Sequence, residues 1–212
     1  MAPTIDTLTI DTLGPALDRL TAKLAEAAPE LNELDGRLGD GDLGATLEKC
    51  ARNLREVRPT LPPDLGQAFK SCAMACSKAS GSSFGTLLAV AFLTLSKATA
   101  GRTEVPWAEL PALLGTVLDA LTARGGASLG DKTVLDTLEA TRAALAGLPE
   151  EERNDPAAQH RAASAAVAAT VDAFRDRPNR IGRARMFADR SIGLDDPGMI
   201  AFRHMLASLG PA

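Results

Sequence analysis

The chain has few aromatic residues. Phenylalanine, tyrosine and tryptophan make up 3% of its 212 residues, and tyrosine is absent. Strands are enriched in aromatic and β-branched side chains, whereas the apolar residues here, 45% of the chain, are dominated by alanine and leucine, which favour helices. The composition therefore predicts an all-α fold. A chain of this length can bury one sizeable core, so we expect a single domain over residues 1–212.

The chain also lacks an excess of positive charge and any long apolar run. Its formal net charge is −4 with 23 lysines and arginines, too few to favour binding to the phosphates of a nucleic acid. No stretch reaches the roughly 18 uncharged apolar residues that would span a bilayer, and residues 1–6 do not resemble a secretory signal. We therefore expect a cytoplasmic protein that binds neither nucleic acid nor membrane.

Cysteine is scarce as well. The three cysteines, Cys50, Cys72 and Cys76, cannot all pair with one another, and the last two lie four residues apart in an alanine-rich helical stretch. Buried or partly buried free thiols are expected here rather than a metal or redox site.

What the chain does contain is helical periodicity. Apolar residues recur every three or four positions, as in Leu13, Leu17, Leu20 and Leu24, which share one helical face. This spacing predicts about eight helices and no competing strand, at residues 9–28, 44–57, 66–79, 83–99, 107–123, 132–147, 157–176 and 196–208. Because a helical bundle keeps its core between the helices, a site built from several loops must gather at one end.

The first unusual connection is acidic. Asp35, Asp40 and Asp42 fall within eight residues, and the interspersed glycines allow their carboxylates to converge. Converging carboxylates repel one another unless a cation lies between them, and oxygen ligands without a nearby histidine or cysteine favour magnesium, with manganese or calcium as alternatives. An Asp/Gly-rich turn in which Asp42 caps the next helix explains the pattern equally well.

Three further connections hold more glycine, serine and arginine than a helix reversal requires. Ser80 and Gly81 precede a helix whose free N–H groups could bind an anion, although an ordinary serine cap also fits. The stretch 124–133 has three glycines, and there Asp131 could cap the following helix and Lys132 could simply be solvated. The stretch 181–198 carries several arginines that could balance a polyphosphate or merely cover a surface, and Arg183 is our preferred candidate.

Taken together and in order, these connections resemble the nucleotide-binding L subunit of dihydroxyacetone kinase, called DhaL. The motifs that carry the resemblance, between about residues 35 and 198, are Gly39-Asp40-Gly41-Asp42-x-Gly44, Ala79-Ser80-Gly81-x-x-Phe84-Gly85-Thr86, Gly130-Asp131-Lys132-Thr133, Gly182-Arg183-Ala184 and Arg190-Ser191-Ile192-Gly193-x-x-Asp196-Pro197-Gly198. The ordered set is far more specific than any one of its members.

This resemblance implies an antiparallel barrel of eight helices that binds ADP or ATP at one end through two Mg²⁺ ions. Asp35, Asp40 and Asp42 match the metal ligands of the family. The positions that match nucleotide contacts are Leu43, Gly44, Ala45, Thr46, Ala79, Ser80, Gly81, Gly125, Val134, Arg183, Asp196, Pro197 and Gly198. No side chain is assigned a catalytic role, because the protein mainly positions the groups for a metal-assisted transfer.

The resemblance also implies partners. In the family, phosphate passes to a small ketose held on a separate K subunit, and ADP is either a bound coenzyme recharged by a phosphotransferase-system protein or replaced by exchanging ATP. Erythrulose or another ketose remains open as the acceptor, and so does a homodimer.

Two positions depart from the family pattern. Leu43 and Leu194 stand where the family usually has histidine, which keeps open a nucleotide-binding regulator without kinase activity. The two remaining histidines, His160 and His204, lie on expected helices and are interpreted as structural or surface residues.

Overall fold

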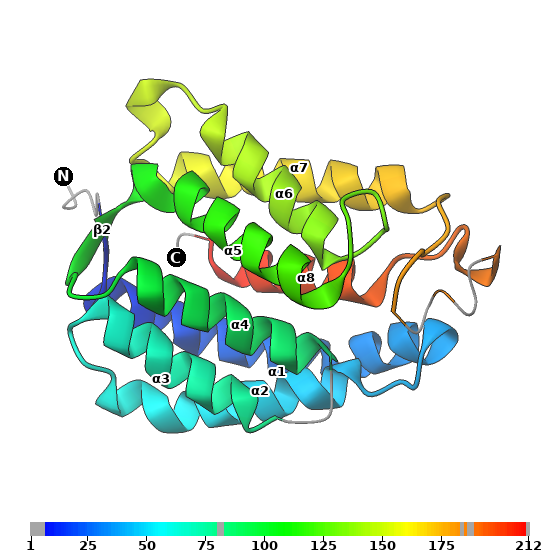
Figure 1. Cartoon of the computed structure of the whole chain (residues 1–212), viewed down its shortest axis with the longest axis horizontal. Coiled ribbons are helices and arrows are strands. Elements are labelled where there is room, and N and C mark those ends of the chain that lie inside the picture. Colours follow the sequence, from blue (N-terminus) through cyan, green and yellow to red (C-terminus); the bar gives the residue numbers. More distant parts are fainter. Residues whose placement is uncertain (1–6, 80–82, 183–184, 186–188, 211–212) are drawn as a thin grey trace.

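The computed structural model describes residues 7–79, 83–182, 185 and 189–210, and this part of the chain contains eight α-helices arranged as an antiparallel bundle (Figure 1). The helices are α1 (Ile10–Leu38), α2 (Leu43–Val57), α3 (Leu65–Ser77), α4 (Ser83–Ala98), α5 (Leu110–Gly125), α6 (Val134–Ala146), α7 (Pro156–Phe174) and α8 (Pro197–Ser208). Short 3-10 helices are η1 (Arg58–Thr60), η2 (Trp107–Glu109) and η3 (Glu150–Glu152). The predicted all-α class is confirmed.

The direction of the chain alternates from one helix to the next. As a result, the C-terminal ends of α1, α3, α5 and α7 and the N-terminal ends of α2, α4, α6 and α8 lie at the same end of the bundle, at the right of Figure 1. The described ends of all four connections singled out in the sequence therefore lie at this end.

The core lies between the helices. Leu24, Leu31 and Leu38 recur at intervals of seven along α1, and each is at most 2% exposed. The first two pack with α2, α7 and α8 in one apolar cluster. A second cluster joins the start of α1 to α2 and α3, and a third joins α5 to α6. None of the described helices combines the length and the apolar character that crossing a bilayer requires.

The first helix corrects one boundary. The helix was expected to end at residue 28, just before Pro29, but α1 continues to Leu38 with Pro29 inside it. Proline in a helix interior costs roughly 3 kcal/mol. Full burial of an apolar side chain contributes about 1.5 to 3 kcal/mol, so burying both Leu31 and Leu38 offsets that cost. The extension places Asp35 on a helix rather than in a loop.

Two smaller findings concern the strands and the cysteines. A short antiparallel pair, β1 (Thr7–Thr9) with β2 (Glu104–Pro106), was not expected, because three-residue strands leave no readable alternation. All three cysteines are buried free thiols, as predicted.

Candidate functional site

Asp35, Asp40 and Asp42 converge where α1 turns into α2. Each offers a carboxylate oxygen, and these oxygens all lie within 4.8 Å of one another. Carboxylates at this separation repel one another, and a divalent cation between them removes the repulsion. An all-oxygen donor set suits Mg²⁺, so the chemistry of the donors fits the metal that the sequence suggests.

The turn itself is fixed by Asp35. Its Oδ2 accepts hydrogen bonds from the backbone N–H groups of Asp42 at 2.9 Å and Leu43 at 3.3 Å. Gly41 has φ +73°, a conformation that favours glycine, and it allows the chain to fold back. Asp42 precedes α2 but makes no capping hydrogen bond with its side chain, so the alternative in which Asp42 caps this helix is wrong. Asp35 satisfies these N–H groups instead.

Gly44 and Ala45 bring α2 close to α1. A Cβ atom on Gly44 would lie 1.9 Å from the carbonyl oxygen of Ala28, so only glycine fits. Next to it, the N–H of Ala45 donates to Asn32 Oδ1 at 3.1 Å. This close packing holds the three aspartates on a rigid helical corner.

A cavity of about 210 Å³ opens beside the aspartates. It is lined by Asp35, Leu38, Asp40, Asp42, Leu43, Ser83, Phe84, Leu87, Thr133, Val134, Ile181, Gly182, Asp196, Pro197 and Gly198. The lining includes the first residues of α2, α4, α6 and α8. Helix N-termini carry partial positive charge, so four of them at one cavity favour an anion that also binds the metal.

The cavity gathers only some of the residues predicted for the site. Those brought together are Asp35, Asp40, Asp42, Leu43, Val134, Asp196, Pro197 and Gly198. Gly44, Ala45, Thr46, Ala79 and Gly125 are not among the lining residues, and Ser80, Gly81 and Arg183 lie outside the described residues. Seven lining residues were not among those predicted for the site: Leu38, Ser83, Phe84, Leu87, Thr133, Ile181 and Gly182. Phe84, Thr133 and Gly182 belong to the quoted motifs, and Ser83 is a hydroxyl residue at a helix start, so these four carried a readable signal.

On the far side of the cavity, Asp196 caps α8. Its Oδ1 accepts from the N–H of Met199 at 2.9 Å, and its Oδ2 accepts from Asn179 Nδ2 at 2.8 Å. Burial raises the pKa of Asp196 to about 6, against the lowering effects of these hydrogen bonds and of the Lys132 ammonium. Asp196 therefore caps α8 and also lines the cavity.

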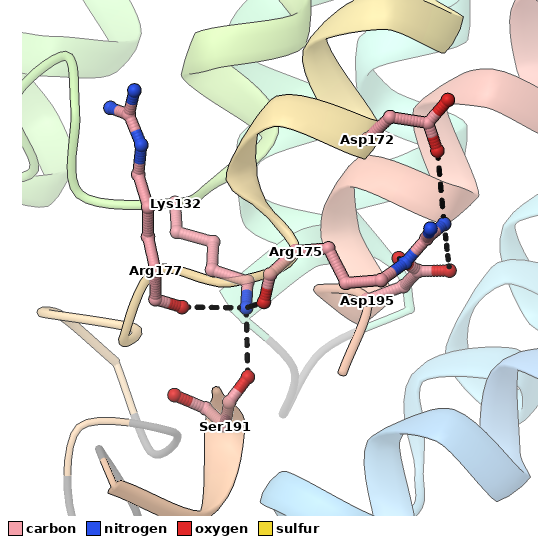
Figure 2. Close-up of polar contacts among 6 residues, drawn as sticks. All are labelled: Lys132, Asp172, Arg175, Arg177, Ser191 and Asp195. Carbon is pink, nitrogen blue, oxygen red and sulfur yellow. Dashed lines mark hydrogen bonds and ion pairs between the residues drawn. The ribbon is translucent and has the colours of Figure 1, made fainter. Parts of the chain in front are cut away.

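Lys132 corrects another expectation. It is not solvated: the residue is 0% exposed, and its Nζ donates to the carbonyl oxygens of Arg175 at 3.0 Å, Arg177 at 2.8 Å and Ser191 at 2.8 Å (Figure 2). Asp131 does not cap α6, because Thr133 does so and Asp131 instead accepts from the N–H of Ser128. A lysine in a glycine-rich loop is equally typical of a solvated side chain, so the sequence carried no signal for this burial.

Both histidines lie away from the cavity lining. His160 Nε2 lies 3.1 Å from the carbonyl oxygen of Leu206, and His204 Nε2 lies 2.9 Å from Glu30 Oε2. Leu43, which stands where the family usually has histidine, lines the cavity, and the two histidines of this chain do not. Neither of them therefore replaces the missing imidazole.

Comparison with known proteins identifies the family of the chain. Residues 37–210 match the DAK2 domain. The chain belongs to the DAK2 domain family. Among its DAK2 relatives is the PTS-dependent dihydroxyacetone kinase, ADP-binding subunit DhaL, of Lactococcus lactis, 32% identical over 206 residues that cover 95% of this chain and 97% of the relative. The D-erythrulose kinase of Mycolicibacterium smegmatis is also 32% identical, but its match covers 86% of this chain and 32% of that protein.

Two solved structures show the same fold. The dihydroxyacetone kinase of C. freundii in its native form superposes with a TM-score of 0.73 at 24% identity, covering 93% of this chain and 33% of that chain. The same kinase in complex with AMP-PNP and Mg²⁺ gives a TM-score of 0.72 at 24% identity, covering 99% of this chain and 35% of that one. The eight-helix arrangement implied by the motifs is thereby confirmed.

Proposed function

We propose that this DAK2 chain is the nucleotide-binding, phosphoryl-transfer subunit of a small-ketose kinase of the dihydroxyacetone type. It binds ADP or ATP in the cavity at the end of the bundle, with two Mg²⁺ ions held by Asp35, Asp40 and Asp42. The acceptor is a hydroxyl group of a short ketose held on a separate K subunit. The C. freundii dihydroxyacetone kinase in complex with AMP-PNP and Mg²⁺ has the same fold, which supports this choice of ligands.

One observation carries the proposal. Three carboxylate oxygens meet within 4.8 Å of one another at a cavity that four helix N-termini also border. The carboxylates favour cations and the N-termini favour anions, so the cavity suits a ligand that presents both charges. A nucleoside polyphosphate with its divalent cations is such a ligand.

Different parts of the cavity have different roles in this transfer. When bound, Mg²⁺ neutralises charge on the phosphate oxygens. The partial positive charges at the N-terminal ends of α2, α4, α6 and α8 orient the polyphosphate. Leu38, Leu43, Phe84 and Leu87 give the cavity an apolar wall that excludes water from the transfer.

The matches favour a bound ADP coenzyme over exchanging ATP. The Lactococcus relative, whose length this chain covers almost completely, is named as PTS-dependent and ADP-binding. The Escherichia coli relative, 28% identical over 87% of its length, is named a PEP-dependent ADP-binding subunit. A phosphotransferase-system protein is accordingly proposed as the phosphoryl donor.

Two measurements test this function. Calorimetry should show that the chain binds ADP with Mg²⁺ and loses most of that affinity in EDTA. Mixed with a ketose-binding K subunit, a phosphoryl donor and dihydroxyacetone or erythrulose, it should yield the phosphorylated ketose, followed by ³¹P NMR. ADP binding that does not depend on Mg²⁺ would contradict the proposal.

Leu43 supports a second candidate, a nucleotide-binding regulator without transfer activity. Leu43 is buried and lines the cavity, so an isobutyl group occupies a position where the family usually has an imidazole. Tight Mg-ADP binding combined with no phosphorylated ketose in the reconstituted mixture would favour this candidate.

A further inference from the structure

Lys132 occupies an unusual position beside the proposed nucleotide site. We propose that its ammonium group is a tethered monovalent cation that positions one wall of the cavity, so that Lys132 is a positioning residue for nucleotide binding. The proposal deepens the proposed function, because nucleotide affinity is its main readout.

The geometry at Nζ is that of a bound cation. The three hydrogen bonds run to the carbonyl oxygens of Arg175, Arg177 and Ser191, at 2.8 to 3.0 Å. An ammonium group has three N–H donors, and all three are used, whereas a neutral amine would turn a lone pair toward a carbonyl. Rings of backbone carbonyl oxygens are also how proteins bind K⁺. The side chain thus delivers a positive charge to a site built from carbonyl oxygens (Figure 2).

The carbonyls belong to two stretches that flank a part of the cavity wall. Arg175 and Arg177 lie in residues 175–182, which end in the lining residues Ile181 and Gly182, and Ser191 lies in residues 189–196, which end in the lining residue Asp196. Backbone bonds join the same stretches: the N–H of Gly193 donates to the carbonyl of Arg175 at 2.9 Å. The ammonium therefore ties both stretches to each other.

Lys132 also connects these stretches to α6 and α8. Its own carbonyl oxygen accepts from Asn179 Nδ2 at 2.9 Å, and the same Nδ2 donates to Asp196 Oδ2 at 2.8 Å. Asn179 is 1% exposed, and its N–H donates to Ser191 Oγ at 2.8 Å. Thr133 and Val134, which follow Lys132 directly, line the cavity. One buried network thus connects three parts of the lining, namely residues 181–182, residues 133–134 and Asp196.

The backbone of Lys132 adopts a conformation that is costly for a residue with a side chain. Its φ is +63°, and among the described residues it is the only one other than glycine with a positive φ. Glycine would adopt this conformation without the steric cost that an L side chain incurs. Burial lowers the pKa of Lys132, which is a further cost, and the carboxylates of Asp196, Asp195 and Asp176 oppose that effect. A lysine is found here despite the steric cost of its φ and the cost of burying its charge. The hydrogen bonds of its ammonium group to the two stretches explain why.

The test replaces the tethered cation with a free one. Lys132→Gly removes the side chain at a φ that glycine accepts, and it leaves the three carbonyl oxygens in place. Lys132→Met keeps most of the side-chain volume but has no charge, and it blocks the vacated space. Lys70→Met, at an exposed position of α3, is the matched control. Mg-ADP affinity is measured by calorimetry with tetramethylammonium, K⁺, ammonium or n-butylammonium as the monovalent cation.

We expect wild type and Lys70→Met to bind equally in all four salts. Lys132→Gly in tetramethylammonium should bind Mg-ADP about 10- to 100-fold more weakly, the range typical for loss of a supporting group behind a ligand. Ammonium, n-butylammonium or K⁺ should restore at least part of that affinity. Lys132→Met should be weakened by a similar factor and should not be rescued, because its side chain fills the space that a cation needs.

Hydrogen exchange of residues 175–182 and 189–196 in the ligand-free protein separates this inference from the proposed function. If wild type does not bind Mg-ADP, the proposed function fails, while faster exchange in Lys132→Gly that ammonium reverses still supports the tether. If both variants bind Mg-ADP like wild type, or if none of the cations rescues Lys132→Gly in either measurement, the tethered-cation role is overturned.

Discussion

The two sides of the cavity are built by different physics. On one side, α1 and α2 meet through leucine packing and a glycine that lets two backbones touch, and the aspartates sit on the resulting rigid corner. On the other side, Lys132, Asn179 and Asp196 hold the segments between α5 and α8 with buried hydrogen bonds. Apolar packing tolerates substitution as long as volume is kept, whereas removing one member of a buried polar network leaves its partners without their hydrogen bonds. The α1–α2 side should therefore respond to volume, and the Lys132 side to charge and pH.

The largest expected effect on stability tests the α1–α2 side of the cavity. Gly44→Ala places a Cβ 1.9 Å from the Ala28 carbonyl oxygen, so α1 and α2 must separate. Overpacking against backbone should lower the free energy of unfolding by about 3 kcal/mol or more. Urea denaturation of this variant can be compared with Gly125→Ala, where an added Cβ meets nothing within 4 Å and stability should change by less than about 1 kcal/mol. Equal stabilities would show that the helices can part at little cost.

The next effect concerns ligand binding on the same side. Asp40→Asn removes one negative charge from the cluster without changing its size. Loss of a charged contact is worth about 2 to 3 kcal/mol, so Mg-ADP affinity measured by calorimetry should fall roughly 30- to 160-fold. Asp119→Asn, at an exposed position of α5, is the control and should bind like wild type. A drop of the same size in the control would mean that overall charge, rather than the cluster, governs affinity.

The pH dependence of stability tests the Lys132 side of the cavity. The pKa of Asp196 is raised to about 6 in the folded protein, so its contribution to stability is fully present below the unfolded value of 3.8 and is lost as pH rises through about 6. The full shift corresponds to about 3 kcal/mol, and because the residue is partly exposed at the cavity we expect about 2 kcal/mol.

Asp196→Asn stays neutral and should lack this loss. Measured by urea denaturation without ligand, its stability relative to wild type should therefore rise by about 2 kcal/mol between pH 4 and pH 7. An unchanged difference across this range would show that the Asp196 carboxyl ionises as readily as it does in the unfolded chain.

The smallest effect compares two helix caps. Thr133 caps α6 at the cavity, and Asp64 caps α3 at the opposite end of the bundle. Replacing either with alanine should cost about 1 kcal/mol of stability. Only Thr133→Ala should also weaken Mg-ADP binding, because Thr133 lines the cavity. Equal nucleotide affinities in the two variants would show that the N-terminus of α6 is not part of the nucleotide site.

The two sides also differ in how far the sequence predicts them. Leucine periodicity predicts the helices, and the ordered aspartate and glycine motifs predict the corner that α1 and α2 form. The end of α1 was missed because the burial of Leu31 and Leu38, which favours a helix that continues through Pro29, depends on the tertiary fold.

The Lys132 side is harder to predict. The burial of Lys132 depends on three carbonyl oxygens that lie 43 to 59 residues away in the sequence, and a backbone carbonyl carries no residue signature. Asn179 gives no signal either, because its partners are Lys132 and Asp196 rather than near neighbours in the sequence. Buried polar networks of this kind are visible only once the fold has brought their members together.

The central claim is that the three aspartates bind divalent cations together with a nucleotide, and Mn²⁺ titration followed by electron paramagnetic resonance in the presence of ADP tests it most directly. Wild type should bind Mn²⁺ tightly with ADP and weakly without it. The triple variant Asp35→Asn, Asp40→Asn, Asp42→Asn should bind neither ion nor nucleotide at the same concentrations while remaining helical by circular dichroism. A folded triple variant that still binds Mn²⁺ and ADP like wild type would contradict the claim.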